Sequence, residues 1–166
     1  VELLLNGRSL GRKKAGVRVG FVSRFSVPYE EGELVAVGYR EGRETGRSSL
    51  RSAGEAQLHL RAERHVIQGS NDLVYIAIEL ADSAGIVESM ASDRLSITIS
   101  GAAELAGFGS ADPASTDAFT GTECATYFGR AQAILRGTAG TDAVTVTVRS
   151  GQHGEAHLTF TVNSAP

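Results

Sequence analysis

Apolar residues alternate with polar or small residues in one segment after another, and this pattern limits the fold more than any other feature. In residues 74–80, valine, isoleucine and leucine occupy every second position, and the same alternation recurs in residues 95–99, 144–148 and 158–162. Successive side chains of an extended chain point to opposite faces. Each of these segments is therefore predicted to be a β-strand with one buried face.

The predicted strands are short and are separated by turns rather than by helices. From residue 55 onward they number about seven and recur roughly every ten to fifteen residues, which is typical of an immunoglobulin-like sandwich. The chain has one cysteine and no tryptophan. The disulfide-and-tryptophan core of antibody domains is therefore excluded, and the core is predicted to be aliphatic.

The N-terminal part predicts a smaller set of strands. Asn6-Gly7 stands between two apolar segments and predicts a tight hairpin, because both central positions of a type I′ turn need positive φ. The apolar residues of 21–27 predict a strand that Pro28 ends. Strands are also predicted over residues 33–40, which have apolar or small residues on both faces, and over the polar residues 43–51.

Small and polar residues at positions 52–55 form the predicted domain boundary. The predicted fold is therefore all-β, with two β-sandwich domains of the immunoglobulin-like kind. The first domain is predicted to span residues 1–54 and the second residues 55–166.

Composition argues against several classes of partner. The 166 residues carry a net charge of −3 with no basic run, so nucleic acid is not expected to bind. No transmembrane run or signal peptide is visible, so no membrane contact is predicted. Cys124 has no second cysteine to pair with, which mildly favours the cytoplasm. The compartment otherwise stays unassigned.

Residues 104–136 contain the longest predicted connection of the chain. It begins and ends in short apolar strands, and between them lie about twenty residues rich in Gly, Ser, Thr, Asp and Pro. Its aromatic residues are Phe119, Tyr127 and Phe128. Long loops in compact domains usually bind something or cover something.

The carboxylates of the chain suggest structural roles. A retaining glycosidase needs two carboxylates about 5 Å apart, and Glu30, Glu31 and Glu33 instead cluster in a turn beside a glycine. Asp112 precedes a proline, which suits the capping of a turn. A structural role is favoured for Asp112 and Asp117, with contact to a ligand or to another domain as the alternative.

Histidine and cysteine also indicate no metal, cofactor or catalytic site. His153 and His157 flank a glutamate, but they lie in a turn that leads into a strand, not on one face of a helix, and no third ligand is suggested. Cys124 has no recognisable histidine partner and is expected to pack. Tyr127 and Phe128 could stack on a sugar ring, although packing in the core or against another domain is favoured.

Three stretches together resemble the C-terminal region of family-two glycoside hydrolases, particularly the β-galactosidase type. They are VELLLNGRSLGRK at the start, FSVPYEEGELVAVGYREGRE after it, and the stretch from DLVYIAIELADSAG through ITISG and GFGSADP to FGRAQAILR. The resemblance covers nearly the whole chain. The third stretch departs from the family's pattern, because Ser110 and Ala111 separate Gly109 from Asp112-Pro113.

The resemblance implies a non-catalytic accessory role. In the family, two glutamates on a (β/α)₈ barrel perform retaining hydrolysis of β-glycosides, and such a barrel needs roughly 250 residues. Residues 1–54 would lack the first strand of their domain. The chain is expected to pack against the barrel or another subunit through residues 104–136. The alternatives are a carbohydrate-binding module and a bacterial immunoglobulin-like spacer or adhesion domain. Contact with a domain or a sugar is expected at Asp112, Tyr127, Phe128 and Arg130.

Overall fold

The computed structural model describes residues 1–163 and divides into two compact units, unit 1 (Val1–Ser52) and unit 2 (Ala53–Pro166). The predicted boundary after residue 54 lies just beyond this division. Within the described residues the one helical element is the 3₁₀ turn η1 (Val17–Val19), which confirms the predicted all-β class. No helix in that part of the chain is long and apolar enough to cross a membrane.

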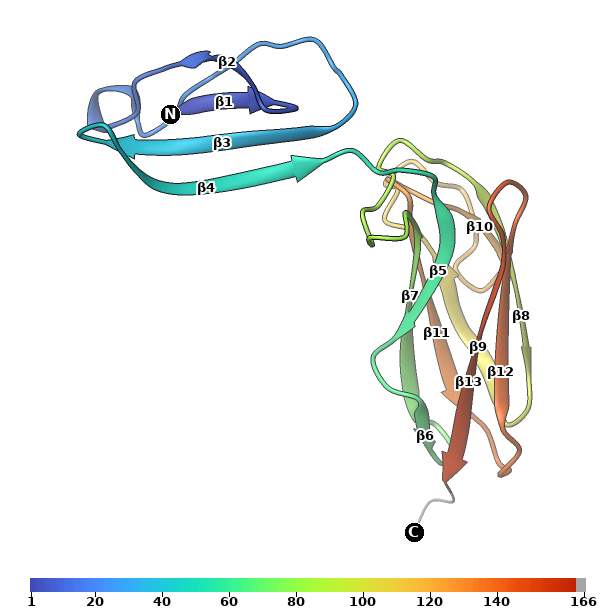
Figure 1. Cartoon of the computed structure of the whole chain (residues 1–166). Coiled ribbons are helices and arrows are strands. Elements are labelled where there is room, and N and C mark those ends of the chain that lie inside the picture. Colours follow the sequence, from blue (N-terminus) through green and yellow to red (C-terminus); the bar gives the residue numbers. More distant parts are fainter. Residues whose placement is uncertain (164–166) are drawn as a thin grey trace. The chain divides into compact units, whose positions relative to one another are not determined.

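Unit 1 is one antiparallel sheet with the strand order β2-β1-β3-β4 (Figure 1). Among its described residues, the buried hydrophobic side chains are those of Leu3, Leu5 and Val37, so its core is small. Asn6 and Gly7 have φ values of 51° and 77°, as the predicted type I′ turn requires. The strands are β1 (Glu2–Leu5), β2 (Arg8–Arg12), β3 (Glu33–Arg40) and β4 (Arg43–Arg51).

Residues 21–27 form no strand, so this part of the sequence prediction is wrong. The chain instead makes η1 and then continues without a regular element as far as residue 32. Gly20 and Phe21 have φ values of 60° and 58°, which turn the backbone away from an extended course. The segment is held by side-chain contacts with main-chain oxygens: Lys13 Nζ donates to Arg24, and Ser23 Oγ donates to Lys14.

Unit 2 is a sandwich of two sheets, with the strand orders β5-β7-β11-β9 and β10-β8-β12-β13-β6 (Figure 1, green to red). This is the immunoglobulin-like architecture predicted from the alternation. The strands are β5 (Gln57–Ala62), β6 (Val66–Gln68), β7 (Leu73–Ala81), β8 (Arg94–Ser100), β9 (Ala103–Gly109), β10 (Glu123–Ala125), β11 (Arg130–Gly137), β12 (Val144–Ser150) and β13 (Gly154–Asn163).

The core of unit 2 is aliphatic apart from two phenylalanines and one cysteine. Strand β7 alternates as predicted, with its even-numbered residues from Val74 to Leu80 inaccessible to solvent. Strands β8, β11 and β12 contribute in the same way. The fully buried side chains of greatest volume are Phe108, Phe160, Ile67, Ile76, Ile78, Leu80, Leu95, Ile97, Leu135, Val74, Val144 and Val146.

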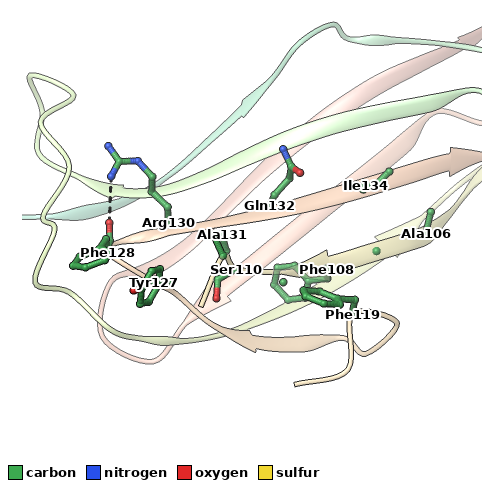
Figure 2. A pocket seen from close by; sticks show the side chains of 13 residues that line it. Ala106, Phe108, Ser110, Phe119, Tyr127, Phe128, Arg130, Ala131, Gln132 and Ile134 are labelled. Atoms are coloured by element: carbon green, nitrogen blue, oxygen red, sulfur yellow. Dashed lines mark hydrogen bonds between the residues drawn. The ribbon is translucent and has the colours of Figure 1, made fainter. Parts of the chain in front are cut away.

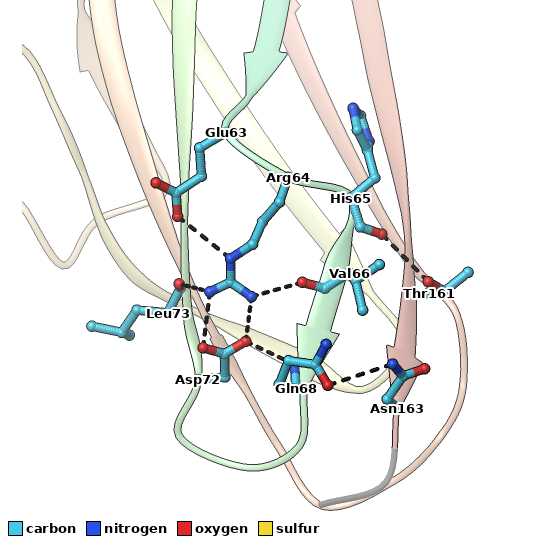
Figure 3. Close-up of polar contacts among 9 residues, drawn as sticks. All are labelled: Glu63, Arg64, His65, Val66, Gln68, Asp72, Leu73, Thr161 and Asn163. Carbon is cyan, nitrogen blue, oxygen red and sulfur yellow. Dashed lines mark hydrogen bonds and ion pairs between the residues drawn. The ribbon is translucent and has the colours of Figure 1, made fainter.

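The chain crosses from one sheet to the other between β5 and β6, and Arg64 fixes this crossing (Figure 3). Its guanidinium donates to both carboxylate oxygens of Asp72, at 2.6 and 2.8 Å, and to the main-chain oxygens of Val66 and Leu73. The main-chain N–H of Gln68 also donates to Asp72, at 2.7 Å. These hydrogen bonds, that of Arg64 foremost, lower the pKa of Asp72 to about 2.

Candidate functional site

Strands β9 and β11 form one side of the sheet that positions the candidate site. They pair antiparallel, with Gly107 opposite Ile134 and Gly109 opposite Gln132. Strand β9 is the edge strand of this sheet, and the main-chain N–H of Phe108 donates to the oxygen of Phe119, at 2.7 Å. The connection after β9 thus folds back along the edge of the sheet.

A hollow of about 780 Å³ lies where this connection, the start of β11 and strand β9 meet. We call it the aromatic hollow, because the rings of Phe119, Tyr127 and Phe128 stand around it (Figure 2). Phe108 is buried, whereas Phe119 and Phe128 are 64% and 54% exposed. The lining consists of residues 106–111, Phe119, Tyr127, Phe128, Arg130, Ala131, Gln132 and Ile134.

Glycine in β9 makes room for the ring of Phe119. A Cβ atom at position 109 would overlap that ring, and one at position 107 would touch Ile134 and the main-chain oxygen of Phe119. Glycine in a strand interior often marks a place where another group approaches closely. The Gly-Phe-Gly sequence of residues 107–109 therefore shapes the floor of the hollow.

A tight turn at residues 127–130 places the ring of Phe128 beside the hollow. Tyr127 and Arg130 exchange two main-chain hydrogen bonds, at 2.9 and 3.1 Å, and the residues between them have φ values of 49° and 69°. This two-residue turn with two positive φ values is the arrangement that favours Asn-Gly. Glycine is required at position 129, because a Cβ there would overlap the main-chain oxygen of Glu88. Phenylalanine at position 128 costs about 1–2 kcal/mol in this conformation.

The polar side chains of the hollow differ in how many hydrogen bonds and ion pairs they make within the protein. Arg130 lies 3.4 Å from Glu79 and makes a long contact of 3.4 Å with the main-chain oxygen of Phe128. Within residues 1–163 no hydrogen bond occupies the side chains of Ser110, Tyr127 and Gln132. These three groups, together with part of Arg130, are available to a ligand.

Of the four residues named from the sequence, Tyr127, Phe128 and Arg130 line the hollow and Asp112 does not. Asp112 accepts a hydrogen bond from the main-chain N–H of Ala114, at 2.9 Å, which is a local turn of the kind that aspartate favours. Whether any of the four contacts a sugar or another domain stays a prediction.

Sequence reasoning did not select Ser110, Phe119 or Gln132 as site residues. A signal existed for Gln132, because it alternates with two alanines and must face away from the core. No comparable signal existed for Phe119, whose place depends on how the connection folds. That connection contains the short strand β10, which the sequence analysis missed.

Asp117 anchors the connection to the second sheet. Its carboxylate accepts from Arg94, at 2.7 Å, and from the main-chain N–H of Ala125, at 3.0 Å. The hydrogen bond from Arg94 is the main reason that the pKa of Asp117 is lowered. Asp117 therefore has the structural contacts that the sequence analysis favoured for it.

Ser150, His153 and Asp93 come together at one end of the sandwich, but not as a catalytic triad. Nδ1 of His153 lies 3.0 Å from Asp93 and 3.4 Å from Ser150 Oγ, and Ser150 also donates directly to Asp93. A triad needs one imidazole nitrogen for the serine and the other for the aspartate. Burial raises the pKa of Asp93, but hydrogen bonds from Ser150 and His153 outweigh it and lower the pKa overall. The cluster closes the β12–β13 turn onto β8.

The remaining titratable candidates also have structural surroundings. Glu30 accepts from Asn6 and Arg8, both at 3.2 Å. Cys124 is 1% exposed, and burial raises the pKa of its thiol to about 12, which keeps it protonated. In the part of the chain that the structure describes, no group of three or more metal-binding side chains is placed to hold an ion.

Residues 58–159 match the family model described as "Glycoside hydrolase family 2 C-terminal domain 5". The chain belongs to glycoside hydrolase family 2. Residues 1–46 match a second family model, described as "Domain of unknown function (DUF4982)". The family-two chain is therefore built from two C-terminal modules of such enzymes, and the predicted resemblance is confirmed at the level of the family.

Relatives place these modules within much longer proteins. A putative β-glucuronidase of Formosa agariphila is 31% identical over 140 residues, which cover 82% of this chain and 14% of that protein. A family-two member from Bacteroides cellulosilyticus is 33% identical, with a TM-score of 0.89 over 98% of this chain and 21% of that chain. A family-two β-glucuronidase shares the fold at 20% identity, with a TM-score of 0.82 over 98% of this chain and 17% of that chain.

This family-two chain thus spans about a fifth or less of the length of the relatives described. It is a non-catalytic C-terminal region of a family-two hydrolase. None of these three relatives is named as a β-galactosidase, so the finer specificity that the sequence resemblance implied is a separate question.

Proposed function

We propose that this chain supports a retaining β-glycosidase by packing against its catalytic domain. The observation that carries the proposal is a set of apolar side chains in the irregular part of unit 1. Val17, Phe21 and Tyr29 are 82%, 73% and 85% exposed. Isolated exposed apolar residues are ordinary, but several gathered in one segment mark an interaction site.

The segment offers a better docking surface than the connection in residues 104–136 that the sequence analysis favoured. That connection is tied to its own sandwich through Asp117 and through β10. The segment of unit 1 has no ladder partner among the described residues, so its side chains are free to be covered. In longer relatives, regions similar to this chain are joined to further domains, which supplies a partner within the same polypeptide.

The test compares the full-length protein with residues 1–166 alone. Phe21→Ser should lower the unfolding temperature of the full-length protein by several degrees, because it removes a buried apolar contact. The same change should leave residues 1–166 almost unaffected, because the ring is exposed there. Met90→Ser is the matched control, since Met90 is 85% exposed in unit 2. Equal effects of Phe21→Ser on both proteins would contradict the docking.

The sugar specificity of the whole enzyme remains open between two proposals. The sequence resemblance favours a β-galactoside, whereas two of the relatives are named as β-glucuronidases. Hydrolysis of 4-nitrophenyl β-galactoside and β-glucuronide by the full-length protein separates them. An enzyme that cleaves neither substrate, nor other aryl β-glycosides, would overturn the assignment to a β-glycosidase.

A further inference from the structure

The aromatic hollow has the composition of a small-ligand site. Its volume of about 780 Å³ falls in the range of roughly 300–1,000 Å³ that is usual for such sites. Its floor is shaped by Gly107 and Gly109, and the rings of Phe119 and Phe128 remain more than half exposed beside it. Because these rings are exposed, a ligand can reach them without any movement of the sandwich; Figure 2 shows how they lie around the hollow.

Phe128 is held in place against the preference of the backbone. A bulky residue with a φ of 49° is unusual, and asparagine would suit this turn better. The ring does not repay this cost by burial, because it is 54% exposed and tilted by 60° against Tyr127 at a centroid distance of 4.4 Å. Strain of this kind is concentrated at sites that bind something.

The polar groups of the hollow identify the kind of ligand. The side chains of Ser110, Tyr127 and Gln132 have no hydrogen-bond partner within residues 1–163, and together they offer several donors and acceptors. Arg130 is the one charged residue of the described lining. A ligand that fits has apolar faces for the rings and hydroxyl groups along its edge. A pyranose has both, since its C–H groups meet the negative face of an aromatic ring.

We propose that the aromatic hollow is a sugar-binding site that takes a pyranose ring. The rings of Tyr127, Phe128 and Phe119 contact the faces of the sugar, and Gln132, Ser110 and Arg130 bind its oxygen atoms. The inference rests on the proposed function only in its choice of a sugar as the ligand, because the substrates of a β-glycosidase are glycans. The site is separate from the hydrolysis, which belongs to a domain outside this chain.

The first experiment titrates residues 1–166 with methyl β-galactoside, methyl β-glucuronide and a glucuronic-acid-containing disaccharide by calorimetry. Saturable binding of at least one sugar is expected. Tighter binding of the two acidic sugars would assign a direct role to Arg130, and equal binding of all three would assign recognition to the rings and hydroxyl groups. No binding by a folded sample at tens of millimolar sugar would overturn the proposal.

Phe128→Asn separates binding from folding. It removes the ring and places a favoured residue in the turn. We expect sugar binding to weaken by about tenfold or more, while the unfolding midpoint of unit 2 rises by a few degrees. Gln132→Ala gives a second readout and should weaken binding without changing the midpoint. Unchanged affinity in both variants, or a lower midpoint for Phe128→Asn, would contradict the assignment.

Glu41→Asn is the matched control for this substitution. Glu41 occupies the first central position of another two-residue turn, with φ values of 51° at Glu41 and 78° at Gly42, and it lies in unit 1. The control substitution should relieve the same kind of backbone strain, that of a non-glycine residue with a positive φ, and should leave sugar binding unchanged. A loss of binding in Glu41→Asn would show that the effect at position 128 is not specific to the hollow.

The outcomes distinguish this inference from the proposed function. If sugars do not bind but the full-length protein cleaves aryl β-glycosides, the hollow alone is misassigned. If sugars bind but the full-length protein has no hydrolase activity, the proposed function fails and the site stands. If sugars do not bind and Phe128→Asn destabilises the full-length protein alone, the hollow contacts another domain and the sugar site is overturned.

Discussion

At the scale of single residues, Arg64 and Asp72 form the best-connected ion pair of the sandwich. Asp72 accepts two hydrogen bonds from the guanidinium and one from the main chain of Gln68. The side chains are 36% and 22% exposed, so solvent screening reduces what the pair contributes. The lowered pKa of Asp72, about 2, makes this contribution depend on pH.

We predict that Asp72→Asn destabilises unit 2 by about 1–2 kcal/mol at pH 7. Because the folded-state pKa is depressed, the stabilisation is complete above the unfolded-state pKa near 4 and is lost as pH falls toward 2. The difference between the two proteins should therefore shrink across that window in urea unfolding. Asp142→Asn, at an exposed position, should show no such difference. A difference that stays constant from pH 7 to pH 2 would contradict this account.

Sequence reasoning succeeded for residues whose position follows from alternation and failed for those that depend on a neighbour. Gln132 faces outward because it lies between two alanines on β11. Phe128 follows no such rule, because its conformation is set by a turn in which asparagine would be expected. The ring of Phe119 occupies the space beside Gly109. The need for glycine at that position could therefore not be predicted without knowing where Phe119 lies.

At the scale of secondary structure, the side chain of Asp117 ties the connection between β9 and β10 to the second sheet. We predict that Asp117→Ala increases amide hydrogen exchange in residues 110–125 by about tenfold, because the contacts with Arg94 and Ala125 are lost. Exchange in β7 and β12 should stay unchanged. Asp112→Ala, which removes only the contact with Ala114, should affect the residues next to it. Equal effects of both substitutions over the whole connection would refute the anchoring role.

The strands show why an apolar pattern can mislead. β7 and β12 were predictable because their alternating side chains fill a core between two sheets. Residues 21–27 also contain several apolar side chains, yet they have no strand beside them with which to pair. Periodicity reports which side chains could be buried on one face, but it does not report whether hydrogen-bonding partners exist. β10 has a strand partner but was missed, because its three residues are too few to show an alternating pattern.

At the scale of the whole molecule, the two units differ in how much they bury. Unit 1 contains few buried hydrophobic side chains among its described residues, whereas unit 2 has a continuous core from both sheets. We predict two unfolding transitions for residues 1–166, with unit 1 melting first. Hydrogen exchange should accordingly be faster in β1–β4 than in β7, β11 and β12. A single transition with equal protection in both units would contradict this prediction.

The single cysteine of the chain can report on local opening of the sandwich. Cys124 lies in β10 with 1% of its surface exposed, and its thiol is protonated at neutral pH because burial raises its pKa to about 12. A maleimide or an aromatic disulfide can reach this sulfur only when the edge strand β10 or the whole sandwich opens. The rate at which Cys124 is labelled under native conditions therefore measures how often this part of the sandwich opens, and the measurement needs no engineered cysteine.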